Sequence, residues 1–159
     1  MKIVHVDVRM ATDEDLYPLV DLAARANADS NYNLPFNDEN AIKYTWENMK
    51  CEGSAVAVAV LDEEIIGFVS MTTSLEYHEK PFCYMTKFWV LPEGKGTDAA
   101  RQLMALLVGW ADDNDCTHIF TTATAELDAV SQQLFINLVK KAGFADVGPV
   151  LSRIMETVL

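Results

Sequence analysis

A glycine-containing turn with two basic residues in or near it is the part of this 159-residue sequence whose residue types could bind a charged ligand. The turn covers residues 93–98, between a run that ends at Pro92 and an amphipathic stretch that begins at Ala99. Such a turn presents backbone N–H groups at the start of a helix, where the helix dipole favours an anion. Lys95 and Arg101 add two close positive charges, so the segment predicts a site for a phosphate-bearing ligand.

The same turn also fits a purely structural role. Lys95 is not followed by Ser or Thr, so the segment is not a G-x-x-x-x-G-K-S/T loop. It does not match G-x-G-x-x-G either. A glycine-containing turn before a helix is common where no ligand binds. Asp98 adds a carboxylate that can accept the helix N–H groups itself and would repel a bound anion.

Apolar periodicity predicts the elements that position this turn. Alternating or continuous apolar runs predict strands at residues 3–8, 54–61, 65–73, 82–91, 117–122, 145–147 and 150–155. Helical spacing predicts helices at residues 13–28, 99–113 and 130–141, and one capped by Asn37 or Asp38 that carries Ile42, Trp46 and Met49. Gly67 indicates a bulge or a close backbone approach. Hairpins and helical crossovers together favour one α/β (α+β) domain over residues 1–159, whose mixed sheet has about six to seven strands and about four flanking helices.

Charge and composition exclude several classes of protein. The chain has 24 acidic and 12 basic residues and a net charge of −12, which disfavours binding to nucleic acid. No apolar run approaches the roughly 18 residues of a membrane helix, and residues 1–5 lack the features of a signal peptide. Three cysteines without C-x-x-C spacing or a nearby His predict reduced, packed thiols and no metal site. We expect a cytoplasmic protein.

The order of elements and the central segment resemble the GNAT superfamily of N-acetyltransferases. The family motif R/Q-x-x-G-x-G/A falls without gaps on residues 95–100, after the lead-in Val90-Leu91-Pro92. Arg101 and Leu103 stand where the family usually has a basic residue and a leucine, and residues 140–144 are similar to its late helix end. Compact chains of this kind also resemble GNAT-like proteins carried by bacteriophages.

The resemblance implies transfer of an acetyl group from acetyl-CoA to a primary amine by direct attack. It implies that backbone N–H groups of the strand before the motif polarise the thioester carbonyl and that the motif turn holds the pyrophosphate. The positions that correspond to this binding site are Trp89, Val90, Lys95, Gly96, Thr97, Asp98, Ala99, Ala100 and Arg101.

Two positions depart from the family pattern, and the general base has no matched position. Asp98 replaces the first motif glycine, and Val139 stands where the family often has a general-acid tyrosine, so that role passes to water or another residue. Candidates for the base lie in or before the strand that leads to the motif, and of these we name Tyr84 and Glu79 as catalytic residues. The alternative function is a catalytically degenerate GNAT-like protein-interaction module with weak or no CoA binding.

The acceptor is less defined by the sequence than the co-substrate. The negative net charge favours a cationic acceptor, such as a small polyamine-like amine or a lysine-bearing protein. We expect the loop of residues 27–40 and the connection at 74–81 to form the acceptor side. A second copy of the chain, as in a homodimer, is a further candidate partner.

Overall fold

A computed structural model describes residues 2–30, 34–121 and 129–147 of the chain. The strands are β1 (Asp7–Met10), β2 (Ser54–Leu61), β3 (Glu64–Ser74), β4 (Phe82–Val90) and β5 (Ile119–Thr121). The helices are α1 (Leu16–Asp29), α2 (Asp38–Lys50), α3 (Ala99–Asp113) and α4 (Ala129–Lys141). Two short 3-10 turns, η1 (Asp13–Asp15) and η2 (Pro92–Gly94), precede α1 and α3.

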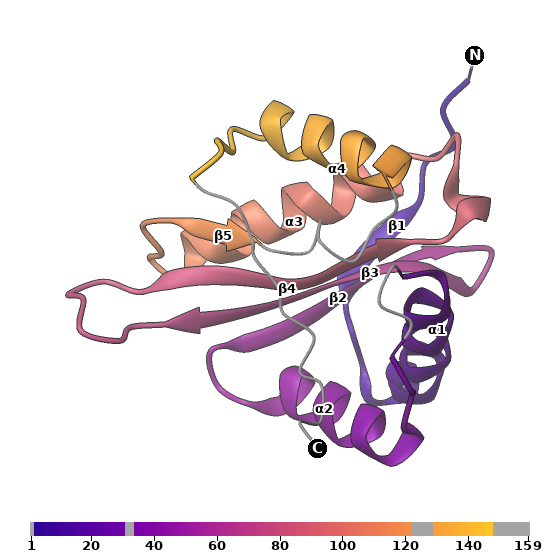
Figure 1. The fold of residues 1–159 in the computed structure, drawn as a ribbon, viewed down its shortest axis with the longest axis horizontal. Helices are drawn as coiled ribbons and strands as arrows, with labels where there is room; N and C mark the ends of the chain where they lie inside the picture. Colours follow the sequence, from indigo (N-terminus) through magenta and orange to yellow (C-terminus); the bar gives the residue numbers. More distant parts are fainter. Residues whose placement is uncertain (1, 31–33, 122–128, 148–159) are drawn as a thin grey trace, which may run out of the picture.

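The strands form one mixed sheet in the order β1-β2-β3-β4-β5. Neighbours are antiparallel except β4 and β5, which are parallel because α3 crosses over between them. Helices α1 and α2 cover one face of the sheet, and α3 and α4 cover the other (Figure 1). The Ala and Val run of β2 is fully buried at its centre, from Ala57 to Ala59, because both faces are covered. The α/β domain with a mixed sheet and four helices confirms the predicted fold class.

The described residues contain five strands instead of the predicted six to seven. Part of the difference lies at the C-terminal end, where the predicted strand at 150–155 falls outside the described residues. At the other end, the predicted strand 3–8 is displaced to Asp7–Met10. Its alternation continues back to Ile3, but only residues 7–10 find partners on β2, whereas Val4 forms a single parallel bridge to Thr97 beside α3.

The hairpin of β2 and β3 contains the close contact that Gly67 predicts. Residues 62 and 63 form the tight turn with positive φ angles of 50° and 66°, which suits the twist of a two-residue hairpin. The register shifts between Ala59 and Val60, opposite Gly67, so the bulge is confirmed. A β-carbon on Gly67 would lie 3.0 Å from the Trp89 carbonyl oxygen and 3.0 Å from a methyl of Val90. Gly67 therefore lets β3 approach the end of β4 closely.

Strand β4 separates from β5 halfway along its length. The two strands pair only from Cys83 to Met85, opposite residues 119–121. A second register shift, in the pairing of β4 with β3 between Ser70 and Met71, places an extra β4 residue at Thr86. Such a bulge bends a strand and increases its twist. Within the described chain, the second half of β4 therefore has strand pairing on its β3 side alone, and its other edge lies open.

Candidate active site

Among the residues that the structure describes, three backbone N–H groups of the turn before α3 have no protein acceptor. In the part of the chain that the structure describes, the amides of Gly96, Ala100 and Arg101 donate no hydrogen bond. The other amides of the turn are used, since those of Lys95 and Thr97 donate to Pro92 and Gly94. Gly96 has a φ of +84°, a conformation that glycine adopts without strain. The turn therefore has unused N–H donors of the kind that an anion site requires, and anion binding there stays a prediction.

A cleft of about 770 Å³ runs from this turn along the open edge of β4. The turn contributes Gly94, Lys95, Gly96, Thr97 and Ala100, and the strand contributes residues 87–90. The opposite wall is α4, through Ser131, Leu134, Phe135 and Leu138. The rings of Phe88 and Phe135 lie 5.3 Å apart and join the two walls. The volume of the cleft is in the range of small-molecule and cofactor sites.

The register of β4 decides which amide faces the cleft. The Leu91 N–H donates to the Ile66 carbonyl at 2.8 Å, so it points toward β3. Strand amides alternate in direction, so the Trp89 N–H also points toward β3 and the Val90 N–H points to the open edge. Of the two residues the sequence places at the thioester carbonyl, Val90 supplies the cleft-facing donor, and Trp89 lines the cleft by its other atoms.

The Asp98 carboxylate points away from the anion site. It accepts from His5 Nδ1 at 2.7 Å, the Val6 amide at 3.0 Å and Gln102 Nε2 at 3.1 Å, and its residue is only 5 % exposed. No helix N–H is capped by its side chain. The interpretation that Asp98 competes for the helix amides is therefore wrong. The His5 hydrogen bond, followed by those from Gln102 and the Val6 amide, lowers the pKa of Asp98 to about 2.

The remaining motif residues have structural roles around this turn. Ala99 is fully buried beneath the start of α3, and the Arg101 guanidinium lies 3.4 Å from the Asp98 carboxylate. Among the described residues, neither Ala99 nor Arg101 lines the cleft. Arg101 could therefore contribute only its unused backbone N–H to a ligand at the turn. Lys95 is the motif's cation that borders the cleft.

Helix α4 presents apolar side chains where a general acid would be useful. Val139 is buried in the core at 7 % exposure, and Phe135 and Leu138 are the α4 residues nearest to it in sequence that line the cleft. None of these side chains can donate a proton. The expectation that protonation of a leaving thiolate passes to water or another residue stays a prediction.

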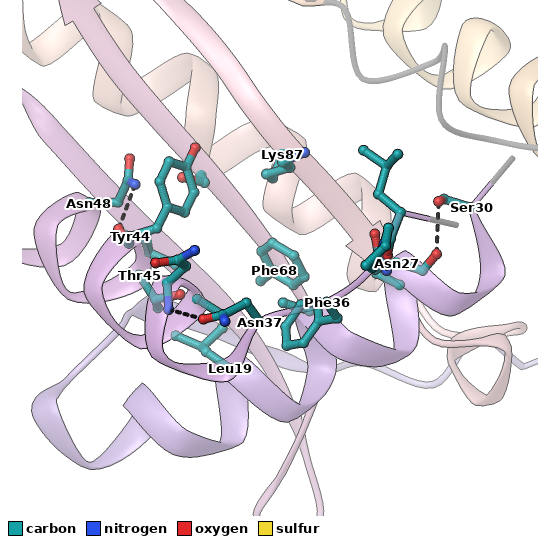
Figure 2. Close-up of a pocket in the computed structure, with 18 residues that line it drawn as sticks. Leu19, Asn27, Ser30, Phe36, Asn37, Tyr44, Thr45, Asn48, Phe68 and Lys87 are labelled. Atoms are coloured by element: carbon teal, nitrogen blue, oxygen red, sulfur yellow. Dashed lines mark hydrogen bonds between the residues drawn. The ribbon is translucent and has the colours of Figure 1, made fainter. Parts of the chain in front are cut away.

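A second cavity of about 390 Å³ lies on the other face of the sheet, under α1 and α2. Figure 2 shows Leu19, Phe36 and Phe68 gathered at its centre, with Lys87 above them on the sheet. The segment 34–37 and both helices form its walls. That residues 27–40 form the acceptor side stays a prediction. Lys87 and Phe68 line both cavities, which places the second cavity directly beside the cleft.

Tyr84 and Glu79 border neither cavity in the described structure. Tyr84 lies on the paired half of β4, where its ring packs against Phe82 and Phe120 at centroid distances of 5.3 and 5.9 Å. Glu79 is exposed in the connection between β3 and β4. Neither side chain contacts the turn, so their catalytic role stays a prediction.

The cysteines are free thiols in three different environments. Cys83 is fully buried, and burial, with a smaller effect of Cys116, raises its pKa to about 12. Such a thiol is not a nucleophile at neutral pH. Cys51 is exposed, so the expectation that all three are packed is wrong for this residue. Among the residues with described side chains, no group of His, Cys, Asp and Glu could hold a metal ion.

Two residues of the second cavity escape prediction from the sequence. Ser70 lies in the middle of an apolar strand, and Lys87 interrupts the aromatic run of β4. Each is a polar residue in a segment that burial would otherwise make apolar. That contrast is the signal that could have identified them, although only the register shows that they are direct partners across β3 and β4.

Comparison with known proteins identifies the class to which this fold and site belong. A profile of the acetyltransferase (GNAT) family matches residues 19–144, a span that includes the turn, both cavities and α4. No curated protein sequence matches the chain. The chain belongs to the GNAT acetyltransferase family, whose acetyl donor is acetyl-CoA.

Solved structures share the fold at low sequence identity. The aminoglycoside acetyltransferase AAC(6')-Iy, in complex with a CoA-containing bisubstrate analogue, aligns with a TM-score of 0.75 and 20 % identity over 97 % of this chain and 100 % of that one. A ribosomal-protein-alanine N-acetyltransferase from Brucella melitensis aligns with a TM-score of 0.71 and 16 % identity over 95 % and 100 %. A transcriptional regulator from Bacillus halodurans aligns at 0.74 and 19 % identity over 95 % and 100 %.

No helix in the described residues is both long and apolar enough to cross a membrane.

Proposed function

We propose that this protein transfers the acetyl group of acetyl-CoA to a primary amine by direct attack of the amine. The observation that supports it most is the set of three unused N–H groups at Gly96, Ala100 and Arg101, at one end of the 770 Å³ cleft. Unused N–H donors at a helix start suit a pyrophosphate, and Lys95 adds a positive charge at the same turn. The residues present therefore fit acetyl-CoA.

The remaining parts of the cleft suit the rest of the co-substrate. The apolar wall of α4 and the open edge of β4 form a channel for an extended, uncharged chain. At the channel's inner end, the Val90 N–H can donate to the thioester oxygen as negative charge develops there. The second cavity opens beside this point, at Lys87, so an amine held there approaches from the opposite face of the sheet.

The reaction forms one bond and breaks another. The lone pair of the neutral amine attacks the thioester carbonyl carbon, an N–C bond forms, and collapse of the tetrahedral intermediate breaks the C–S bond. The proton lost by the amine nitrogen balances the proton gained by the CoA sulfur, and water can carry it. The products are an acetamide and the CoA thiol.

The first experiment measures thermal unfolding with and without acetyl-CoA. A ligand at about 100 times its dissociation constant stabilises the folded state by about 2.7 kcal/mol, which for a chain of this size raises Tm by roughly 5–10 °C. Absence of any shift at millimolar acetyl-CoA would refute the function and favour the alternative of an interaction module.

The second experiment separates pyrophosphate binding from chemistry. Lys95→Glu should raise the KM for acetyl-CoA about tenfold and leave kcat/KM for S-acetylpantetheine, which lacks the phosphates, unchanged. Lys43→Glu, an equal charge change on α2, is the matched control and should alter neither. If Lys95→Glu lowered kcat/KM equally for acetyl-CoA and for S-acetylpantetheine, the turn would not be the phosphate-binding site.

The role of Tyr84 and Glu79 is tested by pH–rate profiles. If either side chain is the base, Tyr84→Phe or Glu79→Gln should abolish the rise of kcat/KM with pH. An unchanged profile in both variants would exclude these two residues as catalytic groups.

A further inference from the structure

One buried hydroxyl in the second cavity has no hydrogen-bond partner among the described residues. Ser70, on β3, is 4 % exposed, and no donor or acceptor of the described chain bonds to its Oγ. Ser70 also lines the 390 Å³ cavity. A buried hydroxyl left without a partner is unfavourable, so a bound molecule, either a ligand or a water, has to complete its hydrogen bonding.

This hydroxyl lies where the second cavity meets the cleft. Ser70 is the cross-strand partner of Lys87 in the register of β3 and β4, so the two side chains leave the same face of the sheet with their β-carbons about 5 Å apart. Lys87 lines both cavities, and so do Phe68 and Ala26. A ligand group at this border therefore lies beside the Ser70 hydroxyl.

The border also has a carboxylate on its cleft side. Asp29 ends α1 and lines the cleft, and the next residue, Ser30, lines both cavities. A carboxylate there attracts the positively charged end of an amine before the amine loses its proton. The Ser70 oxygen can accept a hydrogen bond from an amine N–H, since a hydroxyl oxygen has two lone pairs. The border therefore suits the amino group of an acceptor, and the rest of that acceptor extends into the second cavity.

The floor of the second cavity is apolar. Leu19, Val56 and Phe68 line it and are 2, 5 and 8 % exposed, so the core of the protein forms this floor. Figure 2 shows Phe36, from the segment before α2, gathered with Leu19 and Phe68 at the centre of the cavity. Contact with such a surface favours an apolar ligand, because every methylene that it covers leaves water.

The asparagines around this floor are engaged within the protein. The side chains of Asn27 and Asn48 donate to backbone carbonyl oxygens at 2.6 and 2.8 Å, and that of Asn37 accepts from a backbone amide at 2.9 Å. The bonds of Asn37 and Asn48 are visible at the wall formed by α2 (Figure 2). These bonds hold the amides along the walls, whereas the Ser70 hydroxyl has no such bond in the described chain.

We propose that the acceptor is a small monoamine with an apolar body and that Ser70 Oγ accepts a hydrogen bond from its amino group. This inference rests on the proposed acetyl transfer and specifies its substrate class. The apolar body lies on Leu19, Phe36 and Phe68, in the 390 Å³ cavity. The hydrogen bond to Ser70 holds the nitrogen at the border of the two cavities, where the cleft begins.

The first test compares acceptors that differ in one group. With saturating acetyl-CoA, product formation is measured by mass spectrometry for propylamine, butylamine, pentylamine and hexylamine. We expect kcat/KM to rise about fourfold with each methylene, which is the effect of burying one methylene group.

A diamine of matched size completes this series. In 1,5-diaminopentane, an ammonium replaces the terminal methyl group of hexylamine. Its kcat/KM should be at least about tenfold lower than that of hexylamine, because the second ammonium would lose its hydration against the apolar floor. Equal values for all four monoamines, or a preference for the diamine, would overturn the proposal.

Two variants separate the amino group from the body of the acceptor. Ser70→Ala should lower kcat/KM about tenfold for every monoamine, because it removes a hydrogen bond to the group that they share, and should leave the dissociation constant of CoA unchanged. Phe36→Ala should instead reduce the gain per methylene and have little effect on propylamine. Ser74→Ala, on the same strand but outside the described lining of both cavities, is the matched control and should change neither quantity. An unchanged kcat/KM in Ser70→Ala would show that a water alone completes the hydroxyl and would overturn the proposal.

A binding measurement distinguishes this inference from the proposed function. Hexylamine should raise the Tm of the protein saturated with CoA, in which no transfer occurs, and should raise it less in Ser70→Ala. Stabilisation by acetyl-CoA without any effect of hexylamine would refute the acceptor class and leave acetyl transfer intact. Absence of stabilisation by acetyl-CoA itself would refute the function.

Discussion

Substitution of Gly67 by alanine tests the link between sheet packing and the active site. Gly67 lies opposite Val90 across β3 and β4, and an added β-carbon would lie 3.0 Å from the Trp89 carbonyl oxygen and 3.3 Å from the Val90 α-carbon. Both neighbours are backbone atoms, which cannot rotate away. The strand that carries the cleft-facing Val90 N–H must therefore move by a few tenths of an ångström.

The size of the effect follows from two opposing contributions. Overpacking of this kind costs about 1–3 kcal/mol, whereas replacing glycine by alanine restricts the unfolded chain and returns about 0.4–1 kcal/mol. We expect Gly67→Ala to lower the free energy of unfolding by about 1–2 kcal/mol, which lowers Tm by roughly 2–8 °C.

Gly109→Ala is the matched control. Gly109 lies within α3, and a β-carbon there meets no atom within 4 Å. Because alanine is the better helix former, this variant should gain about 0.5–1 kcal/mol. The same chemical change is therefore expected to have opposite signs at the two positions.

Urea denaturation followed by tryptophan fluorescence measures both values, and steady-state kinetics measures the functional effect. Since Gly67 lies outside the turn that we propose binds the pyrophosphate, Gly67→Ala should reduce kcat several-fold and leave the dissociation constant of CoA unchanged. A Gly67→Ala protein as stable as the parent, or two variants that shift stability in the same direction, would refute the close approach of β3 to β4.

Three further predictions follow from single contacts. Hydrogen bonds hold the pKa of Asp98 near 2, below its ordinary 3.8, so they contribute stability above about pH 4 that is lost as the pH falls toward 2. In Asp98→Asn, the free energy of unfolding measured with urea should therefore depend less on pH between about 4 and 2, and CoA binding should not become tighter. Asn37 accepts from the Asn40 amide at 2.9 Å as the N-cap of α2, so Asn37→Ala should cost about 0.5–2 kcal/mol in the same assay. Cys51 should react with a thiol reagent in the native protein and Cys83 only after unfolding, as mass spectrometry of labelled peptides would show.

The fold could be predicted from the sequence where one segment carried its own signal. The spacing of apolar residues predicts β2, β3, β4 and all four helices, and the capping residues at 37 and 38 predict the start of α2. The strand at 3–8 was misplaced because alternation gives the period of a strand and not its partner. Residues 7–10 find β2, and Val4 instead pairs with the turn before α3.

The candidate site divides in the same way. The turn proposed to bind the pyrophosphate is contiguous in the sequence, so the spacing of its residues is enough to identify it. The second cavity combines one side of α1 and of α2 with Ser70 and Lys87 from two strands, and only the register makes Ser70 and Lys87 neighbours.

Asp98 shows how a chain with a net charge of −12 can carry an acidic residue in the motif and still leave the proposed pyrophosphate site open. Its carboxylate replaces a family glycine, yet it turns toward His5 and the Val6 amide on the side away from the cleft. In that position it holds the N-terminal segment, whose Val4 exchanges backbone hydrogen bonds with Gly96 and Asp98 themselves. Asp98, which the sequence predicts to repel a phosphate, therefore stabilises the turn from the side away from the cleft. Because other groups satisfy its carboxylate, this carboxylate does not bind the amides of Gly96, Ala100 and Arg101, which have no acceptor among the described residues.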